Sequence, residues 1–289
     1  MWCDDPAMGV RPGAREQDRR AAARRPPRRR GTPPPGEAVA MLVRRGFWPW
    51  PAPLDLPFPP DLPEPAQERL ARRLHHYAFR LFLRGAIQRR EGFAPPEATR
   101  YVAAEEAEAM ARELVDISLA DRLPDGRFRL RTPAHSFGGT LEWFVARELR
   151  RRLALDVAVG LKFGARGVGG DLDIVAAGEG RLLYLELKSS PPRNMEAPEV
   201  ASFVARVRSL RPDVAVFVVD TALRLSDKVV PLVCEQMARG GEAPRPRRVV
   251  RELWALTPHV YAANAHPDLI GNIARVLAEG LRALAPPPP

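Results

Sequence analysis

The chain of 289 residues contains only two cysteines, Cys3 and Cys234. Two thiols so far apart in sequence cannot build a disulfide framework or a four-cysteine zinc site, and their scarcity fits a reducing compartment. The chain also lacks an apolar run near the roughly 18 residues that a membrane-spanning helix needs. Its N-terminus lacks the apolar core of a secretory signal. We therefore expect a cytoplasmic protein without a membrane partner.

Lysine is scarce as well, which makes its positions informative. Lys162, Lys188 and Lys228 are the only lysines among 45 basic side chains, so the other 42 are arginines. The formal net charge of +10 makes an acidic polymer the natural partner to consider. Half of this excess lies in residues 1–36, which contain nine arginines and four acidic residues. The rest of the chain is therefore only mildly basic.

Proline, by contrast, is abundant and unevenly placed. Residues 1–65 contain 15 of the 32 prolines. In residues 1–36 prolines alternate with self-repelling arginines, so we expect a disordered tail, either a nucleic-acid-binding arm or a solvated low-complexity segment. Residues 47–65 alternate proline with aromatic and aliphatic residues and should run extended over a neighbouring domain. We assign residues 1–63 to this tail and extended segment.

Residues 64–132 predict a mainly helical module. Apolar residues recur at three-to-four spacing over residues 64–91, at Leu70, Leu74, Tyr77, Leu81 and Phe82. A second helix is expected over residues 97–118. Asp125-Gly126 followed by the alternating Phe128 and Leu130 predicts a β-hairpin. Helices followed by such a hairpin resemble a winged helix-turn-helix, a DNA-binding module, although a plain helical domain packed on its neighbour fits the pattern too.

Residues 133–285 predict an α/β domain. The wholly apolar run at 214–219 is typical of a strand that is covered on both faces. Helices are expected at 140–153, 198–210, 226–239 and 267–284. Strands are expected at 155–163, 172–177, 181–189, 214–219, 248–256 and 259–264.

Charged side chains are placed in register on two of these strands. Because strands alternate faces, Asp171 and Asp173 should share one face of their strand, and Glu186 and Lys188 one face of the next. The short turn at residues 178–180 makes the two strands antiparallel neighbours and can bring Asp173 opposite Glu186. Two carboxylates and one ammonium group would then meet at one place.

Such a group of side chains suits the hydrolysis of phosphodiester bonds. Mg²⁺ prefers oxygen ligands and keeps several waters, so one or two carboxylates and a substrate phosphate are enough to hold it. The metal lowers the pKa of a bound water and neutralises charge in the transition state. A lysine beside that water can orient it, whereas an arginine, planar and with a pKa above about 12, would be a poor substitute. A scarce lysine at Lys188 is therefore informative.

At these residues the sequence resembles the PD-(D/E)xK nuclease superfamily, which includes restriction endonucleases and Holliday-junction resolvases. The family pattern has an acid in an early helix, an Asp before an apolar strand, and Glu-x-Lys on the next strand. Asp173 matches the Asp, Glu186 and Lys188 match the Glu-x-Lys, and Glu142 matches the helix acid. Leu172 replaces the proline that the family has before the Asp. The resemblance covers about residues 140–220.

The resemblance implies a restriction-endonuclease-like core over residues 133–285, a mixed sheet flanked by helices. It also implies an endonuclease that cleaves DNA with Mg²⁺, for which Mn²⁺ substitutes. Asp173, Glu186 and Glu142 would hold the metal, with Asp171 as a second candidate for the metal-facing Asp. Lys188 would act on the attacking water. Whether the protein forms a homodimer, and which form of nucleic acid it cleaves, stay open.

Each of these residues also has a purely structural interpretation. Glu186 and Lys188 could form a solvated pair on an edge strand, the two aspartates could cap a glycine-rich turn, and Glu142 could complement its helix dipole. The arginines at 147–152, 206–211 and 245–251 either hold a phosphate backbone or cover solvated faces. The alternative function is therefore a non-catalytic nucleic-acid-binding or regulatory protein built on a nuclease-like scaffold.

Overall fold

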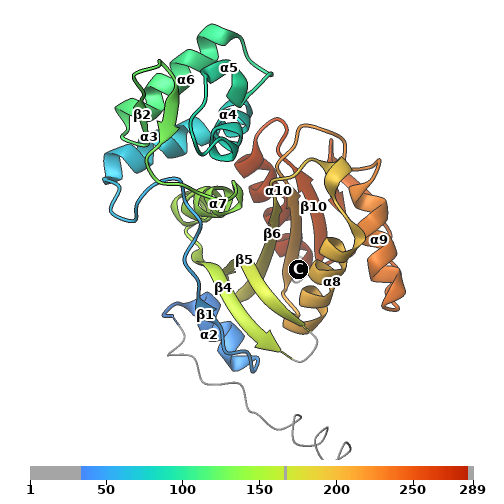
Figure 1. The fold of residues 1–289 in the computed structure, drawn as a ribbon. Coiled ribbons are helices and arrows are strands. Elements are labelled where there is room, and N and C mark those ends of the chain that lie inside the picture. Colours follow the sequence, from blue (N-terminus) through green and yellow to red (C-terminus); the bar gives the residue numbers. More distant parts are fainter. Residues whose placement is uncertain (1–33, 166–167, 286–289) are drawn as a thin grey trace, which may run out of the picture. The chain divides into compact units, whose positions relative to one another are not determined.

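The centre of the fold is an eight-stranded mixed sheet (Figure 1). The structure, a computed structural model, describes residues 34–165 and 168–285, so the tail predicted for residues 1–36 lies almost entirely outside the described residues. Strands β6, β7 and β10 are parallel neighbours, and the remaining pairs are antiparallel. In order across the sheet the strands are β1 (Trp50–Pro51), β4 (Asp156–Ala165), β5 (Val168–Gly178), β6 (Arg181–Lys188), β7 (Val214–Val219), β10 (Val260–Asn264), β9 (Leu253–Ala255) and β8 (Arg247–Val250).

Helices cover both faces of the sheet (Figure 1). Helices α7 (Gly138–Leu153) and α10 (Leu269–Leu284) pack with one face, which includes Leu185. Helices α2 (Glu37–Arg44), α8 (Ala197–Leu210) and α9 (Val229–Arg239) pack with the other, which includes Tyr184. All six residues of β7 are buried, because this central strand has helices on both sides. The α/β architecture, with a mixed sheet flanked by helices, is confirmed.

Helix α2 was not predicted, because the sequence analysis assigned residues 1–63 to a tail and an extended segment. Ala38, Val39 and Leu42 are buried in the same core as α8 and α9. The amide of Ala38 donates a hydrogen bond of 2.7 Å to the carboxylate of Asp156, which satisfies one of the open donors at the start of the helix. This part of the chain therefore contributes to the core of the sheet domain.

Residues 64–132 contain four helices and a hairpin. They are α3 (Glu64–Leu74), α4 (Tyr77–Gln88), α5 (Pro95–Ala98), α6 (Ala104–Asp116), β2 (Ala120–Arg122) and β3 (Phe128–Leu130). The helix predicted over residues 64–91 is divided at His75 and His76, and the helix predicted over residues 97–118 is α6 preceded by the short α5. The predicted hairpin is present, with Gly126 at a positive φ of 85° in its turn. Phe93 adds an antiparallel bridge to Phe128 of β3.

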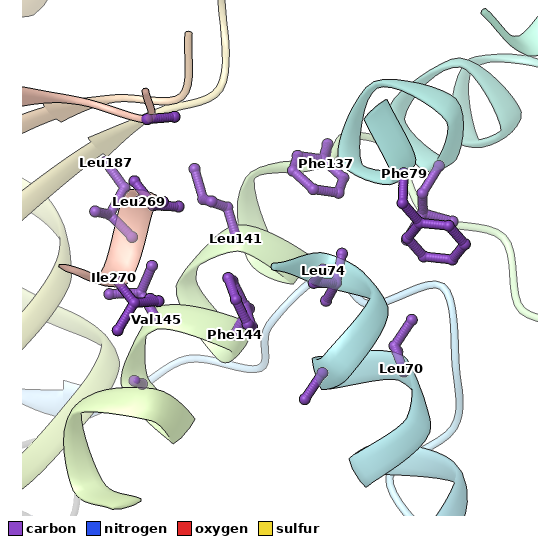
Figure 2. Close-up of a cluster of buried hydrophobic side chains, with 14 of the residues drawn as sticks. Leu70, Leu74, Phe79, Phe137, Leu141, Phe144, Val145, Leu187, Leu269 and Ile270 are labelled. Atoms are coloured by element: carbon purple, nitrogen blue, oxygen red, sulfur yellow. The ribbon is translucent and has the colours of Figure 1, made fainter. Parts of the chain in front are cut away.

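Helix α7 is enclosed between this helical module and the sheet (Figure 2). Phe144 contacts the ring of His75 edge-on, with 5.0 Å between the ring centroids. Val145 lies toward Ile270 of α10 (Figure 2). Apolar side chains on two sides of one helix join the core of the module to the core of the sheet domain. Within the described residues, no helix has both the length and the apolar character needed to cross a membrane.

Candidate active site

The candidate site lies where β5 and β6 diverge. Their ladder ends at the pair Ile174 and Leu185. Beyond it, the carboxylate of Asp173 accepts a hydrogen bond of 2.7 Å from the amide of Leu187 and so replaces the backbone acceptor that the ladder would have supplied. This places the Asp173 carboxyl group beside Glu186, as the sequence predicts.

Strand β5 also changes direction at this point. Leu172 packs in the core with α8 and α9, whereas Ile174, two residues further along, packs in the core with α7 and α10. Regular alternation would have placed both on one face. Gly160 on the neighbouring β4 has a positive φ of 60°, which is consistent with a bend shared by both strands. The expectation that Asp171 and Asp173 share a face is therefore not met.

Asp171 is more exposed than the other acids and has a partner of its own. Its carboxylate lies 3.6 Å from the ammonium nitrogen of Lys162 on β4, and the side chain is 62% exposed. Gly170 before it has a φ of 116°, and a Cβ there would lie 3.1 Å from the guanidinium of Arg206. Asp171 therefore pairs with Lys162 and contributes negative charge near the site, where it helps to raise the pKa of Glu142.

Glu186 is the most enclosed acid of the site. Its Oε1 lies 2.9 Å from the Nζ of Lys188, and its Oε2 lies 2.8 Å from a guanidinium nitrogen of Arg206 on α8. The hydroxyl of Tyr184, which is buried two residues earlier on the same strand, donates to the same Oε2. Two positive charges and a phenol thus fix the orientation of this carboxylate.

Lys188 remains an ammonium group in this setting. Burial lowers the pKa of Lys188, but the charge of Glu186 and the hydrogen bond to it outweigh burial, so that the net shift is upward. The pKa of Arg206 is also raised, because the attraction of Tyr184 and Glu186 exceeds the opposing effect of burial. Both cations therefore keep their protons at neutral pH.

Glu142 approaches Asp173 and Glu186 from α7, which packs on the face of the sheet opposite to α8. Burial and the negative charges of Asp173 and Glu186 raise the pKa of Glu142 to about 8. Burial and the charge of Glu186 raise the pKa of Asp173 to about 7, against the opposing hydrogen bond from Leu187. The three predicted acids are thus close enough to repel one another, and their negative charge is incompletely neutralised by the protein.

The start of α7 is fixed by a residue of the proline-rich segment. The carboxylate of Asp55 accepts hydrogen bonds of 2.7 and 2.9 Å from the amides of His135 and Ser136, just before the helix. A Cβ on Gly139 would lie only 2.6 Å from the carbonyl oxygen of Asp55. The close approach of these two backbones requires a glycine, and it holds the helix turn that presents Glu142.

The acids leave several oxygens open for a cation. Within the described part of the chain, Oδ1 of Asp173 and both carboxylate oxygens of Glu142 have no hydrogen-bond or ion-pair partner. Glu186 already shares its oxygens with Lys188 and Arg206. In the side-chain positions of the described residues, no three acidic, histidine or cysteine side chains form a ready-made metal group. Two open carboxylates nevertheless fit Mg²⁺, which keeps several waters.

Most of the arginines that the sequence offers either as phosphate contacts or as cover for solvated faces have partners within the protein. Arg147 and Arg151 bind Glu68 of α3, at 2.9 and 2.6 Å, and Arg152 binds Glu148 at 2.6 Å. Farther along the chain, Arg208 pairs with Glu242. For these side chains the structural interpretation is the better one.

Sequence reasoning missed two residues that contact Glu186, namely Arg206 and Tyr184. A tyrosine within an otherwise apolar buried run, two residues before Glu186, is a signal that its hydroxyl needs a nearby polar partner. Arg206 had been noted only as one of several arginines. No sequence pattern indicates that α8 aims this guanidinium at Glu186.

The comparisons with known proteins bear on the fold alone. No family model matches the chain, and no curated protein matches it. Protein VC1899 from Vibrio cholerae is similar in structure, with 12% identity and a TM-score of 0.52, over 86% of this chain and 63% of that one. Can2 from Sulfobacillus thermosulfidooxidans, solved in complex with cyclic tetra-adenylate, has 13% identity and a TM-score of 0.49, over 84% of this chain and 60% of that one. The chain thus has a fold like that of VC1899 and spans less than two thirds of either protein.

Proposed function

We propose that the protein is a metal-dependent nuclease that hydrolyses phosphodiester bonds, with DNA as the first expected substrate. The observation that carries the proposal is that Asp173 and Glu186 lie together beside Lys188, with Glu142 of α7 close enough for their charges to raise its pKa. Acids that only stabilise a fold are expected to be neutralised by their neighbours. Here burial and mutual repulsion raise two carboxyl pKa values, which is a pattern typical of functional sites.

A divalent cation would relieve this repulsion. Asp173 and Glu142 would hold it through their open oxygens, and Glu186 would follow if Lys188 released Oε1. Mg²⁺, or Mn²⁺ in its place, would supply an activated water and charge neutralisation at the phosphate. Asp171 is too exposed, and too closely associated with Lys162, to be a preferred ligand.

Hydrolysis adds water across one P–O bond. The water oxygen forms the new bond to phosphorus and loses a proton, and the leaving oxygen departs with the bonding electron pair and gains a proton. Lys188 is already protonated, so it cannot accept the proton of the water. We assign it to orient the attacking water and to stabilise the developing negative charge. Glu142 has two open oxygens, so we assign one of them to the ion and the other, when Glu142 is ionised, to accept the proton.

The helical module is proposed to be a winged-helix relative that does not read duplex DNA. The order α4, Phe93, α5, α6, β2 and β3, with Phe93 bridged to β3, is the order expected of such a fold. The helix before the hairpin is strongly acidic, however, with Glu105 and Glu106 both exposed. An acidic helix is repelled by a phosphate backbone. The module is therefore not expected to dock on duplex DNA through this helix.

A cleavage assay tests the proposal. The full chain is incubated with end-labelled DNA and RNA oligonucleotides, single-stranded and duplex, in Mg²⁺, Mn²⁺ or EDTA. We expect cleavage only with metal and a loss of at least about 100-fold in Asp173→Asn, as is typical when a key electrostatic group is removed. Asp116→Asn, an exposed aspartate on α6, is the matched control. Cleavage of no substrate, or equal cleavage by the two variants, would contradict the proposal.

A non-catalytic nucleic-acid-binding protein is the second candidate. Both Glu186 oxygens are engaged by Lys188, Arg206 and Tyr184, which favours this candidate. In a site that has lost its activity, protein groups are expected to occupy the oxygens that would otherwise bind a metal. It predicts that the wild-type protein binds oligonucleotides without cutting them in either metal, and that Asp173→Asn binds equally well.

A further inference from the structure

A cleft lies between the helical module and the end of the parallel strands. Its volume is about 830 Å³, and it is lined by α4, α5, the segment after α5 and the loops that follow β6 and β7. The amide of Asp220, after β7, donates a hydrogen bond of 2.8 Å to the carbonyl of Lys188. Pro191, three residues after Lys188, belongs to the lining. The cleft therefore begins at the edge of the sheet where the candidate active site lies.

Three arginines line this cleft without an acidic partner. Arg89 lies at the end of α4, Arg100 follows α5, and Arg193 belongs to the short 3₁₀ helix Pro192–Asn194. Within the described residues none of the three lies within 4 Å of a carboxylate, in contrast to Arg147, Arg151 and Arg152 of the α3–α7 region. Unpaired arginines concentrated in a concave surface attract an anion.

The acidic residues of the lining offset only part of this charge. Asp220 is fully buried and already paired with both Arg80 and Arg84, at 2.9 and 3.0 Å. Glu97, which accepts a hydrogen bond from the amide of Ala94 at the start of α5, adds one formal negative charge against the three arginines. A hydrogen bond from Arg100 and the positive charge of that residue, with a smaller contribution from Arg193, lower the pKa of Tyr101. The mouth of the cleft is therefore positively charged.

Exposed flat and apolar side chains accompany the arginines. Tyr101 is 63% exposed and Leu223 is 57% exposed, and they are two of the three large hydrophobic residues exposed in the described part of the chain. Both line the cleft. The guanidinium of Arg100 lies 5.3 Å from the centre of the Tyr101 ring. A basic cleft with an exposed ring is the combination that holds the phosphates and the bases of a single strand.

We propose that this cleft binds single-stranded nucleic acid and leads it to the candidate active site. Arg89, Arg100 and Arg193 contact backbone phosphates, and a base stacks on Tyr101. An unpaired strand is favoured over a duplex because the flat face of a base is available to a side chain only where the base is unstacked. The inference takes from the proposed function only the idea that nucleic acid is the substrate.

The test measures binding without cleavage. Fluorescence anisotropy with labelled oligonucleotides is recorded in EDTA, so that a failure of the nuclease proposal would leave the measurement intact. The full chain is compared with a triple variant in which Arg89, Arg100 and Arg193 are each changed to Gln. The matched control changes Arg72, Arg129 and Arg282 to Gln, which removes the same charge from exposed arginines outside the cleft.

We expect the cleft variant to bind a single strand at least tenfold more weakly than the control variant. The slope of log K against log salt should decrease by about 2, since each phosphate contact on a single strand contributes about 0.7. Tyr101→Ala should weaken binding, whereas Tyr101→Phe, which keeps the ring, should not. Parallel DNA and RNA strands establish which of the two sugars the cleft accepts.

Three outcomes would overturn the inference. The wild-type protein could fail to bind any single strand, the two triple variants could bind equally, or a duplex of the same length could depend on the cleft arginines as strongly as the single strand does. Circular dichroism of each variant confirms that it is folded. Cleavage activity that persists while the two triple variants bind alike would refute the cleft proposal and leave the nuclease proposal standing.

Discussion

Arg206 and Glu186 form a nearly buried ion pair, with 2.8 Å between the guanidinium nitrogen and the carboxylate oxygen. The two residues come from α8 and β6, and the same carboxylate contacts Lys188 on its other oxygen. The contact from α8 therefore helps to orient the carboxylate of Glu186. It also leaves Lys188 as the cation nearer to solvent, since the side chain of Lys188 is more exposed than that of Arg206.

Removal of Arg206 should destabilise the fold, because the buried negative charge of Glu186 would then be balanced by Lys188 alone. We expect Arg206→Ala to lower the free energy of unfolding by about 3 kcal/mol, as is typical when one partner of a buried pair is deleted. Chemical denaturation measures the change. Arg208→Ala removes an exposed partner of Glu242 from the same helix and should cost less than about 1 kcal/mol. Equal losses in the two variants would show that Arg206 has no special role.

The stability of the protein should depend on pH through Glu142 and Asp173. Their pKa values are raised in the folded state, so the stability they contribute is present below the ordinary carboxyl range and is lost as the pH rises toward 7 and 8. In EDTA the free energy of unfolding should therefore fall from pH 5 to pH 9 by up to about 7 kcal/mol, at about 1.4 kcal/mol per pKa unit for each group. Glu142→Gln should flatten this fall, and an unchanged slope would refute the assignment.

Lys188 should be replaceable by neither alanine nor arginine. We expect both substitutions to reduce cleavage by about 100-fold or more, because the position needs a compact ammonium group between Glu186 and the substrate. The pH profile of the residual activity should keep its shape, since Lys188 does not change protonation near neutral pH. Lys162→Ala removes an exposed lysine from β4 and serves as the control. Full activity in Lys188→Arg would contradict this requirement and show that any positive charge at the position is enough.

Two adjacent glycines allow a matched test of how α7 is held. A Cβ on Gly139 would meet the backbone oxygen of Asp55 at 2.6 Å, whereas a Cβ on Gly138 would make ordinary contacts, at 3.4 Å with the hydroxyl of Ser136 and at 4.0 Å with Oε1 of Glu142. Gly139→Ala should therefore cost about 1–3 kcal/mol of stability and reduce cleavage, because the helix that presents Glu142 must shift. Gly138→Ala should be nearly neutral in both measurements. A neutral Gly139→Ala would contradict the proposed role of this contact.

Much of the sheet domain follows from local sequence signals. The expected helix over residues 140–153 corresponds to α7, and the wholly apolar run at 214–219 corresponds to the buried β7. These signals are reliable because hydrophobic periodicity reports directly on which faces are covered. Asp173, Glu186 and Lys188 were predicted together because a short turn fixes how two consecutive strands pair.

The features that sequence analysis missed depend on contacts between distant segments. Helix α2 is short, and its apolar face has a partner only once the sheet exists. The bend at Asp173 interrupts the alternation on which the placement of Asp171 relied. Arg206 reaches Glu186 through the packing of α8, which no local pattern encodes. The division into a tail, a helical module and a nuclease-like domain stays a prediction.

Calorimetric titration with Mn²⁺ at pH 8, without nucleic acid, tests the central claim most directly. The account predicts measurable binding to the wild-type chain, because Glu142 and Asp173 are at least half ionised at that pH and repel each other. It predicts that this binding is lost in Asp173→Asn and retained in Asp116→Asn. Binding of equal affinity in all three proteins, or no binding to any of them, would contradict a metal site at the fork of β5 and β6.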